Sequence, residues 1–169
     1  MKPVDVRLRA MEPEDLELLY RIENDTELWN VSATNVPYSR YALHDFIANS
    51  SSDIYRDRQV RLMIENTNHE TIGIVDVVNF DPQHLRAEIG IVIMGAYRRQ
   101  GYGVRTLGKI EDYARTVLHL HQIYAVIGAS NAVSIRLFHS LHYDQSARLK
   151  DWLFDGKAYH DALLMQKQL

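Results

Sequence analysis

The segment that decides the fold reads Arg98-Arg99-Gln100-Gly101-Tyr102-Gly103. It follows an extended apolar run that ends at Ile93, and an amphipathic stretch begins directly after it, so the pattern predicts a strand, a tight loop and a helix. The first turn of such a helix leaves backbone N–H groups unpaired and carries partial positive charge. Glycines let a phosphate approach the backbone, and the two arginines add cationic donors. The segment is therefore predicted to bind an anion.

The glycine spacing separates this loop from two other phosphate-binding loops. A dinucleotide-binding turn has the pattern G-x-G-x-x-G and a P-loop has G-x-x-x-x-G-K-[ST], and the segment matches neither. Two glycines and an arginine also occur in turns that bind nothing. The loop has to be interpreted together with the elements around it.

Toward the N-terminus, periodicity predicts one strand followed by two helices. Residues 4–10 alternate apolar and polar side chains, as in a half-buried strand. The acids of residues 12–15 open a helix that runs through Ile22. Ser39 is the predicted N-cap of a second helix, which ends at residues 49–52.

The rest of the chain contains three strand-like runs, 60–65, 71–78 and 86–93, which predict an antiparallel meander. Residues 104–118 have apolar side chains at steps of three and four, so a helix is expected there, followed by a central strand at 123–127.

The C-terminal part adds a helix and a hairpin to this order. Asn131 is the predicted N-cap of a helix that reaches about Leu141. Residues 147–154 and 158–165 flank Asp155-Gly156, a two-residue hairpin signal. No internal repeat, low-complexity tract or linker interrupts the chain, so a single domain over residues 1–169 is expected.

Composition excludes several classes of protein. The hydrophobic content of 46% and the charged content of 24% are those of a globular chain with a packed core. Without cysteine there is no disulfide framework, thiolate nucleophile or cysteine-ligated zinc. The net charge of -3 with interspersed signs provides no basic stripe for nucleic acid. The first residues lack a long apolar stretch, so no membrane span is expected and a cytoplasmic location is the simplest prediction.

The spacing Arg98-x-x-Gly101-x-Gly103 resembles the R/Q-x-x-G-x-G/A signature of the GNAT N-acetyltransferases, whose loop holds the pyrophosphate of CoA. The predicted order of elements is similar to that family over about the whole domain. Residues 86–93, the helix from Asn131 and the tail 156–165 resemble the branch with spermidine acetyltransferases and ribosomal-protein N-terminal acetyltransferases.

This resemblance implies an α+β fold, an α/β/α sandwich whose mixed, mostly antiparallel sheet has about seven strands with about four helices. It also implies acetyl-CoA as co-substrate and direct transfer of the acetyl group to a primary amine in a ternary complex. The acceptor is expected to be a small molecule or a peptide, and the resemblance is compatible with a homo-oligomer.

The resemblance assigns the cofactor site to the strand before the loop, the loop itself and one face of the helix after Asn131. The strand contributes main-chain groups, and Asn131 serves both as N-cap and as a contact to the cofactor arm. The expected cofactor-binding residues are Ile91, Val92, Ile93, Arg98, Arg99, Gln100, Gly101, Tyr102, Gly103, Val104, Asn131, Ser134 and Phe138.

Position 138 departs from the family pattern, because many members have a tyrosine there that protonates the leaving thiolate. Phe138 has no proton to donate. His142, Tyr143 and solvent are the alternative donors, with solvent preferred. A catalytically reduced acyl-CoA-binding domain is therefore an alternative reading of the chain, as is a nucleotide-binding domain of another kind.

Glu88 is the predicted general base, since it is a carboxylate near the start of the strand that carries the acetyl site. A salt bridge with Arg86, or another base, is the alternative. The eight histidines contain no metal-ligand pair such as H-E-x-x-H, and His119 and His121 are predicted to be surface residues.

The acceptor is expected between the two early helices, where Glu23, Asp25, Glu27 and Trp29 offer negative charge and an aromatic face to a cationic amine. A solvated acidic helix end is the alternative. Residues 31–38 contain no acid, whereas spermidine acetyltransferases tend to have glutamates there. A polyamine or diamine is the first candidate acceptor, and a protein N-terminus is the second.

Overall fold

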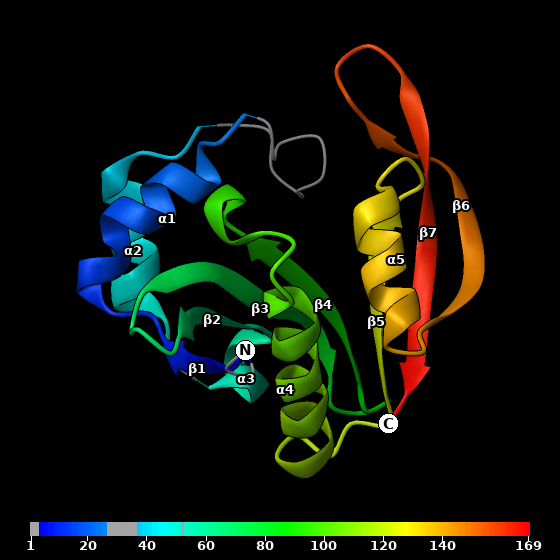
Figure 1. Cartoon of the computed structure of the whole chain (residues 1–169), viewed down its shortest axis with the longest axis horizontal. Helices are drawn as coiled ribbons and strands as arrows, with labels where there is room; N and C mark the ends of the chain where they lie inside the picture. Colours follow the sequence, from blue (N-terminus) through cyan, green and yellow to red (C-terminus); the bar gives the residue numbers. More distant parts are fainter. Residues whose placement is uncertain (1–3, 27–36, 52) are drawn as a thin grey trace.

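The computed structural model describes residues 4–26, 37–51 and 53–169. In these parts of the chain one sheet has the strand order β1-β2-β3-β4-β5-β7-β6, and its only parallel pair is β4 with β5 (Figure 1). The predicted mixed, mostly antiparallel sheet is confirmed. The strands are β1 (Val6–Ala10), β2 (Val60–Asn66), β3 (Thr71–Asp81), β4 (Arg86–Ile93), β5 (Gln122–Gly128), β6 (Asp144–Phe154) and β7 (Tyr159–Gln168).

The described residues form five α-helices, against the four or so that were predicted. The additional helix is α3 (Ile54–Asp57), a single turn whose N-cap Asp53 accepts the N–H groups of Tyr55 and Arg56. One turn is too short to give a periodic pattern. The others are α1 (Leu16–Glu23), α2 (Arg40–Asn49), α4 (Tyr102–Thr116) and α5 (Ala132–Ser140), with short 3-10 turns at Pro13–Asp15 and Gly95–Tyr97.

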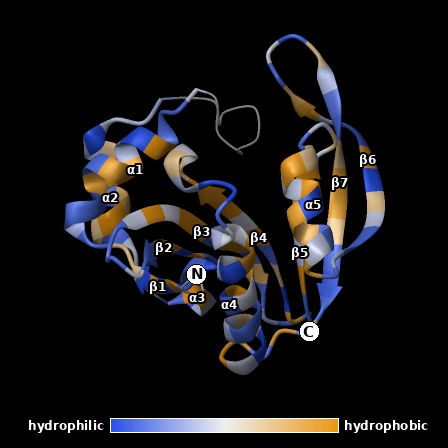
Figure 2. Ribbon diagram, in the orientation of Figure 1, coloured by the Kyte–Doolittle hydropathy of each residue, from blue (hydrophilic) through white to orange (hydrophobic). Residues whose placement is uncertain are grey.

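Helices cover both faces of the sheet, as the predicted α/β/α sandwich requires. Leu19 of α1 and Leu43 of α2 pack on Met63 and Ile74 on one face. On the other face α4 and α5 pack on the larger core, which includes Leu107, Ile110, Val75 and Phe138. Hydrophobic residues, orange in Figure 2, therefore recur along β3, β4, β5 and β7 in the middle of the sheet. None of the helices in the described residues is long and apolar enough to cross a membrane.

Both predicted side-chain caps are present. The Ser39 hydroxyl accepts the Ala42 N–H at 3.0 Å, and the Asn131 side-chain oxygen accepts the Ser134 N–H at 3.1 Å. Each cap satisfies one backbone donor that the first turn of a helix leaves unpaired. The residues at which α2 and α5 begin are thus determined by the capping side chains next to them in the sequence.

The β6–β7 turn is displaced by one residue from its prediction. The Asp155 N–H donates to the Ala158 carbonyl at 3.1 Å, which makes Gly156 and Lys157 the central residues of the turn. Gly156 has φ +94°, a left-handed conformation that suits glycine. Asp155 instead accepts the N–H groups of Lys157 and Ala158, so its carboxylate holds the turn from outside.

An ion-pair cluster ties α1 to the sheet. Arg61 on β2 contacts Asp76 on β3 at 2.7 Å and also Glu23 at the end of α1. All three side chains are less than a quarter exposed. The cluster therefore links the C-terminal end of α1 to strands β2 and β3.

We expect Arg61→Met to reduce the free energy of unfolding by about 3 kcal/mol, because two half-buried carboxylates lose their shared cation. Urea unfolding measures the change. Arg40→Met is the matched control, since Arg40 pairs with Glu17 on an exposed surface, where solvent screens the pair, and its loss should be clearly smaller. Equal losses in the two variants would contradict a specific role for the cluster.

Candidate functional site

The parallel strands β4 and β5 pair over only three residues each. The pairs join Arg86, Ala87 and Glu88 to Gln122, Ile123 and Tyr124. Beyond Glu88, β4 continues along β3 as far as Ile93, whereas β5 continues along β7 as far as Gly128. The two strands therefore separate and leave an opening in the middle of the sheet, as the resemblance predicted.

Main-chain groups of β4 face this opening. The Met94 N–H donates to Ile72 of β3, and a β-carbon added to Gly73 would lie 2.1 Å from the Val92 carbonyl oxygen. Val92 thus points its main chain toward β3, and alternation along the strand points the main chains of Ile91 and Ile93 toward the opening. The predicted main-chain role fits Ile91 and Ile93 and does not fit Val92, whose groups are used by the sheet.

The loop before α4 follows the opening directly. Its backbone is left-handed at Arg99, with φ +60°, and at Gly101, with φ +88°. The Arg98 guanidinium donates from Nε to the Ile93 carbonyl at 2.8 Å, which fastens the loop to the end of β4. The Gln100 amide donates to the Ala96 carbonyl at 2.9 Å. Arg98, Arg99 and Gln100 are all exposed, so the loop presents its cations to solvent at the mouth of the opening.

The N-terminus of α4 presents unpaired amides beside these cations. Gly101 is the N-cap and contributes no side-chain oxygen, and the first helical bond joins the Arg105 N–H to the Gly101 carbonyl. The N–H groups of Tyr102, Gly103 and Val104 therefore have no acceptor within the helix. This is the arrangement that binds phosphate groups at helix N-termini.

The two glycines serve different purposes. Gly101 is needed for its positive φ, which other residues adopt only under strain. Gly103 lies against α5, because a β-carbon there would be 3.1 Å from a methyl carbon of Leu137. The sequence-based interpretation, in which both glycines make room for a phosphate, missed this packing role of Gly103.

On α5, the predicted residues differ in accessibility. Asn131 and Ser134 are half-buried and share the capping hydrogen bond. Phe138 is 2% exposed and packs edge-on against Tyr143, with ring centroids 4.9 Å apart. Phe138 is thus a core residue here, and its contact with a cofactor stays a prediction.

Neither alternative proton donor lies in the opening. Tyr143 is 1% exposed, and burial, with the nearby Glu111 carboxylate, raises the pKa of its phenol. The neighbouring Lys167 stands opposite Ile123, where β4 and β5 are still paired. His142 is exposed and lines a surface hollow with Gln122, at the end of β5 that is still paired with β4. The structure therefore gives neither residue a place beside a leaving thiolate.

Glu88 stands at the last paired position of β4, where the opening begins. Its carboxylate accepts the Asn79 side-chain amide at 2.8 Å. Arg86, the predicted alternative partner, pairs with Asp81 at 3.3 Å instead. The group that contacts the Glu88 carboxylate is thus the uncharged amide of Asn79.

The predicted acceptor residues are only partly described. Glu23 belongs to the Arg61 cluster, and Asp25 follows the end of α1. Glu27, Trp29 and positions 31–36 lie outside the described residues. His119 and His121 are exposed, as predicted, and no group of three or more potential metal ligands occurs in the described residues.

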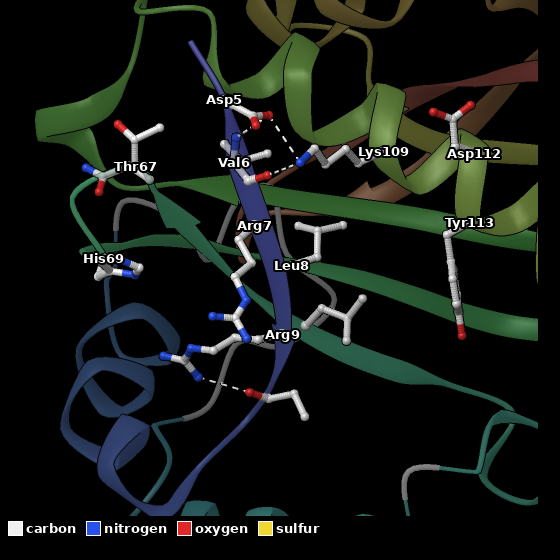
Figure 3. Close-up of a pocket in the computed structure, with 13 residues that line it drawn as sticks. Asp5, Val6, Arg7, Leu8, Arg9, Thr67, His69, Lys109, Asp112 and Tyr113 are labelled. Atoms are coloured by element: carbon white, nitrogen blue, oxygen red, sulfur yellow. Dashed lines mark hydrogen bonds and ion pairs between the residues drawn. The ribbon is translucent and has the colours of Figure 1, made fainter.

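A cavity of about 670 Å³ lies away from all these residues, between β1, the β2–β3 turn and α4 (Figure 3). There Lys109 reaches from α4 to the Asp5 carboxylate at 3.1 Å and to the Val6 carbonyl. Hydrogen bonds from Arg105 and Lys109 lower the pKa of Asp5 to about 2. These contacts cover polar groups of the edge strand β1, which protects it from pairing with another chain. The cavity contains none of the predicted site residues.

A strand pair that opens beside an anion-binding helix start is the arrangement that the resemblance implied for an acyl-CoA-dependent transferase. Residues 5–144 match the family model described as an acetyltransferase (GNAT) domain. The chain belongs to this family and is an acetyl-CoA-dependent N-acetyltransferase.

Several known proteins resemble the chain over nearly its whole length. Spermidine N(1)-acetyltransferase of Escherichia coli K12 is 26% identical over 164 residues, which are 95% of this chain and 84% of that protein. The crystal structure of spermidine N-acetyltransferase from Vibrio cholerae in complex with CoA and spermine has a TM-score of 0.89 and 22% identity, covering 97% and 95% of the two chains. A dodecameric structure of the Vibrio cholerae enzyme has a TM-score of 0.80 and 25% identity, covering 97% and 94%.

We expect Gly101→Ala to weaken acetyl-CoA binding by on the order of tenfold, because a β-carbon in the left-handed region costs about 1–2 kcal/mol or distorts the loop. Isothermal titration calorimetry measures the affinity. Gly108→Ala is the control in the same helix, since nothing lies within 4 Å of its new β-carbon and its affinity should be unchanged. Unchanged binding by Gly101→Ala would contradict the role of the loop.

Proposed function

We propose that this enzyme acetylates a primary amine of a small polycation, a polyamine or diamine, with Glu88 as general base. The observation that carries the proposal is the position of Glu88, a carboxylate with a neutral partner at the vertex of the β4–β5 opening. The proposal is supported by the 26% identity to a spermidine N(1)-acetyltransferase over 95% of the chain.

Charge on the acceptor side of the sheet favours a cationic substrate. Asp76 stands opposite Gly90 in the β3–β4 register, so Asp76 and Glu88 project from the same face. That face is the one covered by α1 and α2, since Val92 of β4 packs there. This face therefore carries the Glu88 carboxylate beside Asp76, and Asp76 and Glu23 both pair with Arg61. A cationic amine is attracted to such a surface.

We assign the cofactor to the other side of the opening. The N–H groups at the start of α4, with Arg98 and Arg99, would hold the pyrophosphate, and Gln100 and Gly101 keep the loop in shape. The main chains of Ile91 and Ile93 would bind the pantetheine arm and polarise the thioester carbonyl. Asn131 and Ser134 would contact the arm from α5.

The chemistry then needs no covalent enzyme intermediate. The amine nitrogen forms a bond to the thioester carbonyl carbon while Glu88 takes the amine proton, directly or through a water. The carbon–sulfur bond breaks and CoA leaves as the thiolate, which takes a proton from solvent because Phe138 has none. The products are the N-acetyl amine and CoA.

Two features of organisation belong to the same proposal. We infer one domain over residues 1–169, because a single sheet takes strands from near both ends of the chain, β1 and β7. A homo-oligomer is supported by the dodecameric Vibrio cholerae structure. A cytoplasmic location stays a prediction.

Thiol release from acetyl-CoA tests the acceptor. We expect turnover with spermidine, spermine or a short diamine, and little with amino acids, aminoglycosides or N-terminal peptides. Glu88→Gln should lower kcat by on the order of 10²–10⁴-fold, as expected when a general base is lost. Glu14→Gln, the same change at an exposed position of the 3-10 turn Pro13–Asp15, should leave kcat unchanged.

If only the N-terminal peptides were acetylated, the acceptor would be a protein N-terminus and the polyamine proposal would be wrong. Full activity of Glu88→Gln would remove Glu88 from the mechanism. Silence across the whole panel, with acetyl-CoA still bound tightly, would favour a reduced, acyl-CoA-binding role.

A second variant tests whether the lack of a general acid at position 138 limits the reaction. Phe138→Tyr should raise kcat, by at most on the order of 10²-fold, if protonation of the thiolate limits the reaction. The same change at an exposed site, Phe154→Tyr, is the control. An unchanged kcat for Phe138→Tyr, with stability lowered by a buried unpaired hydroxyl, would show that position 138 does not face the sulfur.

A further inference from the structure

Strand β3 contains a bulge opposite the candidate base. Val78 is paired with Glu88 and Asp81 with Arg86, so Asn79 and Phe80 together oppose the single residue Ala87. Asn79 has φ +50°, a conformation that asparagine tolerates better than most residues. A bulge of this kind bends the strand and redirects a side chain.

Phe80 shows what the bulge does to the alternation of β3. Phe80 is 3% exposed within the core that also includes Val77, its N–H donates to the Arg58 carbonyl at 3.0 Å, and its ring meets Tyr55 edge-on at 5.1 Å. Because Val77 and Phe80 both point into this core, the bulge places the Asn79 side chain on the opposite face of β3. There the Asn79 amide donates to Glu88 Oε2 at 2.8 Å.

The charged neighbours of Glu88 are held elsewhere. Arg86 pairs with Asp81, whose other carboxylate oxygen accepts the N–H groups of Gln83 and His84, each at 3.0 Å. Tyr124 of β5 stands beside Glu88 in the parallel register. Burial, with the Glu88 charge, raises the pKa of the Tyr124 phenol, so the phenol is neutral at physiological pH. Asn79, which contacts the carboxylate, and Tyr124, which stands beside it in the register, are thus both neutral, and Arg86 is paired with Asp81.

We propose that Asn79 is a positioning residue for the Glu88 carboxylate, fixing Oε2 through a neutral donor and leaving Oε1 and the negative charge for the acceptor amine. The inference rests on the proposed function only in taking Glu88 as the base. A cation in place of the amide would stabilise the charged form of the carboxylate strongly and make it a poorer proton acceptor. A carboxylate with no donor would be free to rotate away from the amine.

Two variants of Asn79 test this role. Asn79→Gly removes the amide and suits the positive φ, so the bulge should persist. Asn79→Asp keeps the shape but places a second carboxylate beside Glu88. Both should lower kcat by on the order of tenfold or more, with KM for acetyl-CoA unchanged.

The pH profile separates positioning from a merely structural effect. Hydrogen bonding to a carboxylate favours its charged form, so losing the Asn79 donor should move the acid limb of kcat/KM to higher pH. Asn79→Asp should move the limb further, because like charges disfavour ionisation. Asn68→Gly and Asn68→Asp, in the β2–β3 turn at the opposite end of β3, are the matched controls and should leave the limb in place.

Unchanged kcat and acid limb in both Asn79 variants, together with an inactive Glu88→Gln, would overturn the positioning role and keep Glu88 as the base. An active Glu88→Gln would overturn the base and the positioning role together. Lowered kcat with a shifted limb only in the Asn79 variants supports the proposal. Circular dichroism and thermal unfolding of each variant show whether its fold is intact.

Discussion

The interaction on which the rest of the site depends is the short parallel pairing of β4 with β5. Three residues on each strand hold the two halves of the sheet together, and beyond Glu88 each strand keeps only its antiparallel neighbour. Main-chain groups that would be satisfied in a continuous sheet become available to a ligand. The strand separation therefore provides the main-chain groups of the proposed cofactor site without requiring any particular side chain on β4.

The same point on the sheet gathers the groups proposed to act on the acceptor. Glu88 occupies the last paired position, the bulge of β3 delivers Asn79 to it, and Tyr124 stands beside it on β5. The α1 end is fixed over this face by Arg61, which holds Glu23 and Asp76. Binding the thioester and deprotonating the amine are thus assigned to adjacent parts of one opening, reached from its two sides.

The core on the α4 and α5 side includes position 138, where this chain departs from the pattern that the family resemblance implied. Phe138 packs edge-on against Tyr143 and both are almost fully buried, so the aromatic pair contributes to the core whether or not it meets the cofactor. Tyr143 keeps its hydroxyl near Glu111 and Lys167, away from the opening. Protonation of the thiolate by solvent is consistent with this packing.

The sequence by itself determined the elements whose signals are local. Ser39 and Asn131 mark where helices begin, strand periodicity gives the meander, and the glycine loop predicts the anion site, because caps, alternation and positive φ depend on neighbouring residues. Only the tertiary structure decided what Gly103 packs against, which main chains of β4 face the opening, and that Asn79 rather than Arg86 contacts Glu88. Those outcomes depend on strand register and a bulge, which arise from contacts between residues distant in sequence.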